Sequence, residues 1–190
     1  MKCLLCESFS LSHICSSCQT LYLTPHIYKR KIDNIDVISF YKYSDIKELL
    51  HTKHTDLGYY IYSILAKNSF KKFAKNFSYP NKITSLGIDE SVKSGYSHTA
   101  ILNKSLKSSS IQPQFNKLKA SNTLSYSGQN REFRFNNPRN FQFKNTQYSE
   151  IILVDDIITT GSTLSQAIQI VSQEQKEVLF CLTLADASLK

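Results

Sequence analysis

The sequence predicts an α/β protein whose parallel sheet is flanked by helices, and three observations indicate this. Segments that read as strands lie at 37–43, 83–88, 151–154 and 178–185, and 151–154 is a continuous apolar run rich in β-branched residues, typical of a strand buried on both faces. Stretches with helical spacing of apolar residues separate the segments, as expected for a parallel sheet. After 151–154 come two acids, a loop of small residues and a helix, the order in which α/β proteins build phosphate sites.

Composition and charge narrow the class of protein. A chain of 190 residues with 41% hydrophobic and 20% charged residues has material for one domain and a small appendage. No apolar run approaches the ~20 residues that span a bilayer, and the N-terminus lacks a secretory signal. We therefore expect a cytoplasmic protein, with peripheral attachment to the inner membrane left open. The net charge of +8 favours polyanionic partners such as nucleic acid, nucleotides or an acidic membrane face.

Four of the five cysteines form two Cys-x-x-Cys pairs near the N-terminus, Cys3 with Cys6 and Cys15 with Cys18. Two such pairs complete a tetrahedral S₄ site, which predicts structural Zn²⁺ in a finger over residues 1–24. A redox pair would need a thioredoxin-like context, which the sequence lacks. The remaining residues, 25–190, are assigned to the α/β domain. Its lone Cys181 lies in an apolar run and is expected in the core.

Residues 29–77 carry a basic patch, a strand and two helices. The patch at 29–31 is either a solvated face or a phosphate contact. A short helix is predicted at 46–50, and a helical stretch of about twenty residues follows Gly58. Its aromatic stripe, which includes Tyr59, is expected in the core, and its lysines are expected in solvent.

The stretch 150–163 carries the clearest functional pattern. Strand alternation sends the side chains of Asp155 and Asp156 different ways. Gly161 lets the backbone approach a ligand closely, and the N-terminus of the following helix offers N–H groups to an anion. Four hydroxyl residues add donors around the glycine: Thr159, Thr160, Ser162 and Thr163. The alternative is an ordinary turn between a strand and a helix with an acidic cap.

The whole run resembles the phosphoribosyl pyrophosphate (PRPP) motif of type I phosphoribosyltransferases. The resemblance implies that Asp155 and Asp156 bind the ribose hydroxyls and are the candidate catalytic residues. It also implies that the loop 159–163, with Gly161, holds the 5′-phosphate, and that Mg²⁺ accompanies PRPP.

Two further segments resemble the ComF family, a competence-associated branch of these proteins. Residues 49–56 resemble its Leu-Lys-Tyr-x-x-Asp segment, which implies that Lys53 meets the pyrophosphate of PRPP. Residues 93–98 resemble its Arg-Gly-Phe-Asn-Gln pattern, so His98 is either a general acid/base or a polar residue of a helix. The family implies natural transformation, with single-stranded DNA, an inner-membrane uptake channel and cytoplasmic DNA-processing proteins as partners.

Residues 108–146 are polar, and within them cationic and amide residues alternate with phenylalanine. One interpretation is a hairpin insertion, or hood, whose apolar inner face covers the active site. The other is a platform on which bases of single-stranded DNA stack while cations follow the phosphates. The candidate residues for that contact are Arg131, Phe133, Arg134, Arg139 and Phe141.

Three hypotheses for function follow. The protein is a PRPP-dependent enzyme with an unidentified acceptor, or a DNA-binding module whose PRPP pocket is a sensor or relic. The third hypothesis is an adaptor between the uptake pore and cytoplasmic DNA-handling proteins. The interpretation preferred from the sequence is a protein that binds both PRPP and single-stranded DNA.

Overall fold

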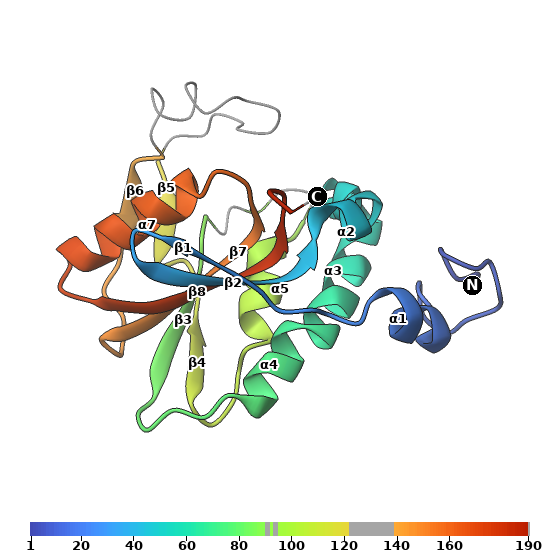
Figure 1. Cartoon of the computed structure of the whole chain (residues 1–190), viewed down its shortest axis with the longest axis horizontal. Helices are drawn as coiled ribbons and strands as arrows, with labels where there is room; N and C mark the ends of the chain where they lie inside the picture. Colours follow the sequence, from blue (N-terminus) through green and yellow to red (C-terminus); the bar gives the residue numbers. More distant parts are fainter. Residues whose placement is uncertain (90–91, 93–94, 122–138, 190) are drawn as a thin grey trace.

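The computed structural model describes residues 1–89, 92, 95–121 and 139–189 (Figure 1). Its centre is a six-stranded sheet in the order β1-β2-β8-β7-β3-β4, in which every pairing except β1 with β2 is parallel. The predicted α/β class with a mostly parallel sheet is confirmed. The strands are β1 (Tyr28–Ile32), β2 (Ile35–Lys42), β3 (Ile83–Gly87), β4 (Ile111–Gln114), β7 (Glu150–Ile158) and β8 (Glu177–Asp186).

Helices cover both faces of the sheet, with α7 on one side and α3 to α5 on the other (Figure 1). Alternate residues of β7 join two separate cores: Ile152 and Val154 pack with α3 and α5, whereas Ile151 and Leu153 pack with α7. This alternation explains why the run reads as continuously apolar. The helices are α1 (Ser16–Tyr22), α2 (Tyr43–Leu50), α3 (Asp56–Asn68), α4 (Phe70–Asn76), α5 (His98–Lys104) and α7 (Ser162–Gln173), with a 3₁₀ turn η1 (His51–His54).

The helical stretch predicted after Gly58 differs from the structure in two respects. It is divided into α3 and α4 at Ser69, whose φ of −109° and ψ of −80° are not helical. The Ser69 hydroxyl donates to the Leu65 carbonyl over 2.6 Å, which satisfies a carbonyl at the end of α3. Tyr59 is 49% exposed, so its assignment to the core was wrong. It lies in the first turn of α3 and contacts the ring of Tyr96 instead of the sheet.

A second, two-stranded sheet pairs β5 (Leu118–Ala120) antiparallel with β6 (Phe141–Phe143). Part of the predicted hairpin insertion is thus present in β6, while residues 131–135 lie outside the described residues. Phe141 is only 8% exposed and packs in the core that includes α7. For this residue the structure matches the interpretation of a hairpin with an apolar inner face.

The N-terminal segment packs against α3, on the face of the main sheet that α3 to α5 cover. Ile14 and Leu23 belong to the same buried cluster as α3. The His13 ring lies 4.5 Å from the ring of Tyr60, and the Asn68 amide of α3 donates to the Gln19 side chain over 3.2 Å. The boundary near residue 24 stays a prediction. Among the described residues, no helix has the length and apolar character needed to cross a membrane.

Candidate functional site

The carboxylate of Asp156 lies at the centre of the candidate site, near the carboxyl end of β7. Its Oδ2 atom is approached by three groups from other elements. Lys53 Nζ lies 3.2 Å away, His98 Nε2 lies 3.3 Å away, and the Tyr62 hydroxyl lies 3.4 Å away. Its Oδ1 atom accepts the N–H of Ile157 over 2.8 Å. Lys53 and Asp156 were predicted to hold parts of one ligand, and the fold brings them together across 103 positions of sequence.

The two neighbouring acids have opposite electrostatic environments. Burial tends to raise the pKa of Asp156, but hydrogen bonding and charge from His98 and Lys53 outweigh it and hold this pKa well below 3.8. The pKa of Asp155 is raised well above 3.8, first by burial and then by the adjacent charge of Asp156. Asp155 Oδ1 accepts the N–H of Asp156 over 2.8 Å. At neutral pH Asp156 is therefore the firmly ionised member of the pair.

Strand alternation places the two acids on opposite sides of the sheet, as predicted. Asp156 faces the side of α3 and α5, where Tyr62 and His98 contact it. The charge of Asp155 acts on Cys181 in the opposite core, where burial first and that charge second raise the thiol pKa to about 12. A ligand that contacts both acids has to lie across the end of the strand.

The backbone of the loop between β7 and α7 has the features that favour anion binding. Gly161 has a φ of +85°, a left-handed value that favours glycine. It is also the N-cap of α7 and has no side chain to occupy the first N–H groups of the helix. The Thr160 hydroxyl lies 3.3 Å from that of Ser162 and 3.4 Å from the Ser162 N–H. N–H groups and hydroxyls thus gather at the positive end of a twelve-residue helix.

Two aromatic residues that the sequence did not single out for the site hold its shape. Tyr62 is fully buried, and its hydroxyl reaches Asp156. The Tyr96 hydroxyl donates to the carbonyl of Lys53 over 2.6 Å. A Cβ atom at Gly58 would lie 2.1 Å from that hydroxyl and 2.2 Å from the Thr52 carbonyl oxygen. The close approach of α3, η1 and Tyr96 therefore requires glycine at position 58.

The four N-terminal cysteines are gathered in one place. Their sulfur atoms all lie within 4.8 Å of one another, and the Sγ atoms of Cys6 and Cys15 are 3.7 Å apart. A tetrahedron with Zn–S bonds of 2.3 Å has edges of about 3.8 Å. The Cys15 N–H donates to Cys3 Sγ over 3.3 Å, and this bond is the main cause that lowers the Cys3 pKa to about 6. Cys3, Cys6, Cys15 and Cys18 could therefore hold a zinc ion.

The predicted DNA-binding residues fall into two groups. Arg131, Phe133 and Arg134 lie outside the described residues. Arg139 is four-fifths buried, with its Nη1 atom 3.3 Å from Asp89 Oδ2. Its N–H donates to a side chain of α7. With Phe141 buried as well, both described candidates contact the protein's own interior.

The sequence profile of the PRTase-CE family matches residues 27–188. The chain belongs to the PRTase-CE family. No curated protein matches the chain. The matched residues include all six strands of the main sheet, from β1 to the end of β8. They also include Lys53, Asp156 and the loop 159–163. The narrower ComF assignment of this PRTase-CE protein stays a prediction.

Solved phosphoribosyltransferases resemble the PRTase-CE chain at low identity. A crystal structure of adenine phosphoribosyltransferase aligns at 15% identity over 88% of each chain, with a TM-score of 0.43. A hypoxanthine phosphoribosyltransferase from Staphylococcus aureus aligns at 19% identity and a TM-score of 0.40. That alignment spans 66% of this chain but only 62% of the Staphylococcus enzyme. A Trypanosoma cruzi hypoxanthine phosphoribosyl transferase aligns at 20% identity over 74% of this chain and 66% of its own, with a TM-score of 0.36.

Proposed function

We propose that this protein binds PRPP at the carboxyl end of β7 and transfers its phosphoribosyl group to a nucleophilic acceptor. The observation that carries the proposal is the 3.2 Å contact between Lys53 and Asp156, since the two residues were assigned to one ligand from separate motifs. In the proposed complex Asp155 and Asp156 bind the ribose hydroxyls, and residues 159–163 hold the 5′-phosphate. Membership of the PRTase-CE family supports a ligand of the PRPP type.

The proposed reaction breaks the bond between C1′ of the ribose and the pyrophosphate oxygen, and forms a bond between C1′ and the acceptor. Pyrophosphate leaves with the electron pair, and the proton of the acceptor passes to a base. Lys53 would stabilise the charge on the leaving group, since an ammonium is a compact and mobile partner for phosphate. His98, 3.3 Å from Asp156, is the candidate acid/base. Adjacent carboxylates suit Mg²⁺, which when bound with PRPP would offset pyrophosphate charge.

Calorimetric titration of PRPP with Mg²⁺ tests the proposal. We expect saturable binding to the wild type and a loss of about tenfold or more in Lys53→Gln, because a charge-assisted contact contributes about 1.5–3 kcal/mol. Lys67→Gln on α3 removes an exposed lysine and serves as the matched control. Ribose 5-phosphate, which lacks pyrophosphate, should bind both variants equally. Absence of PRPP binding to the folded, zinc-loaded wild type would contradict the proposal.

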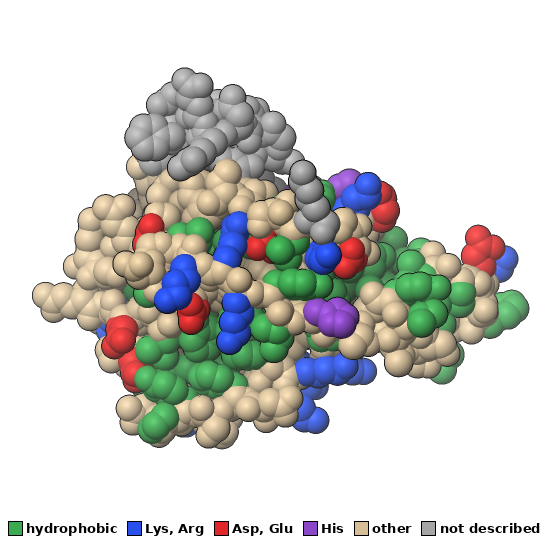
Figure 2. All heavy atoms as spheres, viewed as in Figure 1, with side chains coloured by type: hydrophobic (Ala, Val, Ile, Leu, Met, Phe, Trp, Pro, Cys, Tyr) green, Lys and Arg blue, Asp and Glu red, His purple; other side chains and the backbone are tan. Residues whose placement is uncertain are grey.

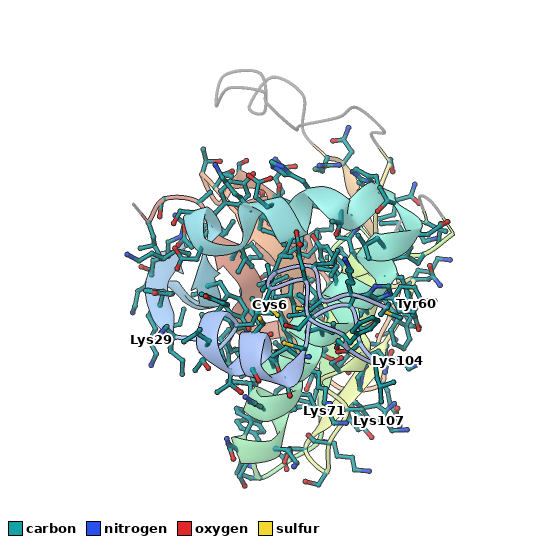
Figure 3. All side chains as sticks on the ribbon, turned by 90° about the vertical axis from the view of Figure 1, so that its right-hand side faces the viewer. Cys6, Lys29, Tyr60, Lys71, Lys104 and Lys107 are labelled. Carbon is teal, nitrogen blue, oxygen red and sulfur yellow. The ribbon has the colours of Figure 1, made fainter. Side chains whose placement is uncertain are left out.

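A second proposed role is binding of single-stranded DNA during natural transformation, in the cytoplasm or at the inner membrane beside the uptake channel. The distribution of charge supports it: residues 57–149 contain 14 of the 23 basic residues but only 3 of the 15 acidic residues. Lys71, Lys104 and Lys107 project from the same side of the molecule as the exposed ring of Tyr60 (Figure 3). On the face drawn in Figure 2, by contrast, acidic and basic side chains are interspersed.

Binding of a fluorescent oligonucleotide at increasing salt tests this role. Contacts to several phosphates predict that the logarithm of the affinity falls linearly with the logarithm of the salt concentration. Lys104→Glu and Lys107→Glu should weaken binding, and Lys29→Glu, an exposed lysine outside the basic region 57–149, is the matched control. An adaptor without DNA affinity would show no binding at low salt, and that result would exclude the second role while leaving PRPP binding intact.

A further inference from the structure

The antiparallel edge strand β1 contacts the phosphate loop from the side. Two guanidinium nitrogens of Arg30, at the centre of β1, donate hydrogen bonds near the end of β7, and the third, Nε, makes an ion-pair contact. Nη2 donates to the Thr159 carbonyl over 2.7 Å, and Nη1 donates to the Ser188 hydroxyl over 3.1 Å. Nε lies 3.4 Å from Oδ2 of Asp186, a nearly buried carboxylate at the end of β8. One side chain thus joins β1, the end of β8 and the first residue of the loop.

Two neighbours of Arg30 contact the same loop and helix. A Cβ atom at Gly161 would lie 2.3 Å from Ile32 Cδ1, so the side chain of Ile32 packs directly on the glycine. The Ser165 hydroxyl in the first turns of α7 donates to the Asp33 carboxylate. Asp33 and Asn34 both have positive φ and form the tight turn from β1 into β2.

We propose that Arg30 is a positioning residue for the phosphate loop: it fixes the Thr159 carbonyl and so aims the N–H groups of residues 160–163 at the bound phosphate. The inference rests on the proposed binding of PRPP. Asp186 in turn fixes the guanidinium, and it also accepts the Ser188 N–H over 2.8 Å. Because each peptide unit is planar, fixing the Thr159 carbonyl also orients the next N–H.

The chemistry of the contact explains why arginine is needed. A planar fork with five donors can reach a carbonyl, a hydroxyl and a carboxylate at once, while the single ammonium of lysine cannot. Lys29 and Lys31 flank Arg30 in the same strand, and both are exposed. Lys29 projects at the edge of the molecule (Figure 3). The basic patch 29–31 therefore divides into two solvated lysines and one arginine that contacts the loop.

The test compares Arg30→Lys and Arg30→Gln with Lys29→Gln, which removes the same charge from the same strand. We expect PRPP affinity to fall about tenfold or more in both Arg30 variants and to change less than about twofold in Lys29→Gln, as for loss of a charge-assisted hydrogen bond. Amide hydrogen exchange without ligand gives the second readout: the Ser165 N–H, which donates to the Gly161 carbonyl over 2.9 Å, should exchange about tenfold faster in both Arg30 variants. Arg30→Lys keeps a cation beside Asp186, so its melting temperature should stay close to that of the wild type.

The outcomes separate this inference from the proposed function. If the wild type binds PRPP and Arg30→Lys binds it equally well, the positioning role is overturned while PRPP binding stands. If the wild type does not bind PRPP, the proposed function fails, and hydrogen exchange alone decides whether Arg30 orders the loop. Unchanged exchange of the Ser165 N–H in both Arg30 variants would overturn the inference in either case.

Discussion

The two adjacent acids should respond in opposite ways to the same substitution, because their carboxylates have different partners. Asp156→Asn removes the charge that Lys53 and His98 contact. Asp155→Asn removes a charge that burial and the neighbouring carboxylate disfavour. We expect the first variant to lose stability and the second to stay close to the wild type or gain slightly.

The magnitude follows from the contacts. Each hydrogen bond to a charged group contributes about 1.5–3 kcal/mol, and three donors approach Oδ2 of Asp156. The distances of 3.2–3.4 Å are long, and the Lys53 and His98 side chains are about a quarter exposed, so solvent screens part of each contribution. Asparagine also keeps one acceptor oxygen. The expected loss is therefore about 2–3 kcal/mol of unfolding free energy for Asp156→Asn, against a change within about 0.5 kcal/mol for Asp155→Asn.

Urea unfolding of the zinc-loaded protein at pH 7, followed by circular dichroism, measures both values without any ligand. Equal slopes of free energy against urea for the three proteins would show that the midpoints report stability. A stability of Asp156→Asn equal to or above that of Asp155→Asn would refute the reasoning.

The pH dependence of the difference in unfolding free energy between Asp156→Asn and the wild type gives an independent check. Since the folded-state pKa of Asp156 lies below its ordinary value of 3.8, its contribution to stability is present above that value and is lost as the pH falls below it. The deficit of Asp156→Asn should thus persist down to about pH 4 and should shrink below it. Asp155, whose pKa is raised, has the opposite sign: its charge lowers stability increasingly as the pH rises above 3.8.

Three further substitutions test the group of four cysteines and two glycines. Cys6→Ser should lower the zinc content, measured with a colorimetric chelator after denaturation, whereas Cys181→Ser should keep one equivalent of zinc per chain. Gly161→Ala should cost about 1–3 kcal/mol in urea unfolding because of its φ of +85°, and a smaller change would argue against that backbone. Gly58→Ala should also cost about 1–3 kcal/mol by overpacking, since the Thr52 carbonyl is backbone and has to shift; a stabilised variant would contradict the close approach.

Local pattern was enough to predict the four central strands of the main sheet and the glycine loop before α7. Residues 151–154 of β7 are a continuous apolar run, and the four cysteines have the spacing of a metal site, so both are visible in short windows of sequence. Edge strands β1 and β4 were not predicted. Strand β1, Tyr-Lys-Arg-Lys-Ile, has little apolar character and forms a strand only by pairing with β2. A usable signal was present in Asp33-Asn34, two residues that tolerate positive φ in a hairpin turn.

Contacts made across the sheet could not be predicted, because the residues that form them do not recur at a regular spacing in the sequence. Arg30 and Thr159 lie 129 positions apart, and Tyr62 reaches Asp156 across 94 positions. In the sequence Tyr62 is one aromatic among several in an amphipathic helix, and its hydroxyl contact is decided by the packing of α3 against β7. Residues that hold a site in shape are therefore harder to predict than the residues that belong to its motif.

The resting charge balance of the site has a consequence for how a ligand enters it. The charge of Asp156 is compensated in advance by Lys53, and His98 and Tyr62 also contact its Oδ2 atom, so the buried carboxylate needs no metal to be tolerated in the fold. In the free protein the Lys53 ammonium contacts Asp156 at 3.2 Å, whereas in the proposed complex it contacts the pyrophosphate group. Entry of PRPP would transfer the ammonium from carboxylate to phosphate and leave Asp156 free to accept the ribose hydroxyls. Because one ionic contact replaces another, the exchange lowers the desolvation cost of binding, and it makes Lys53 the residue whose position should differ most between the free and the bound protein.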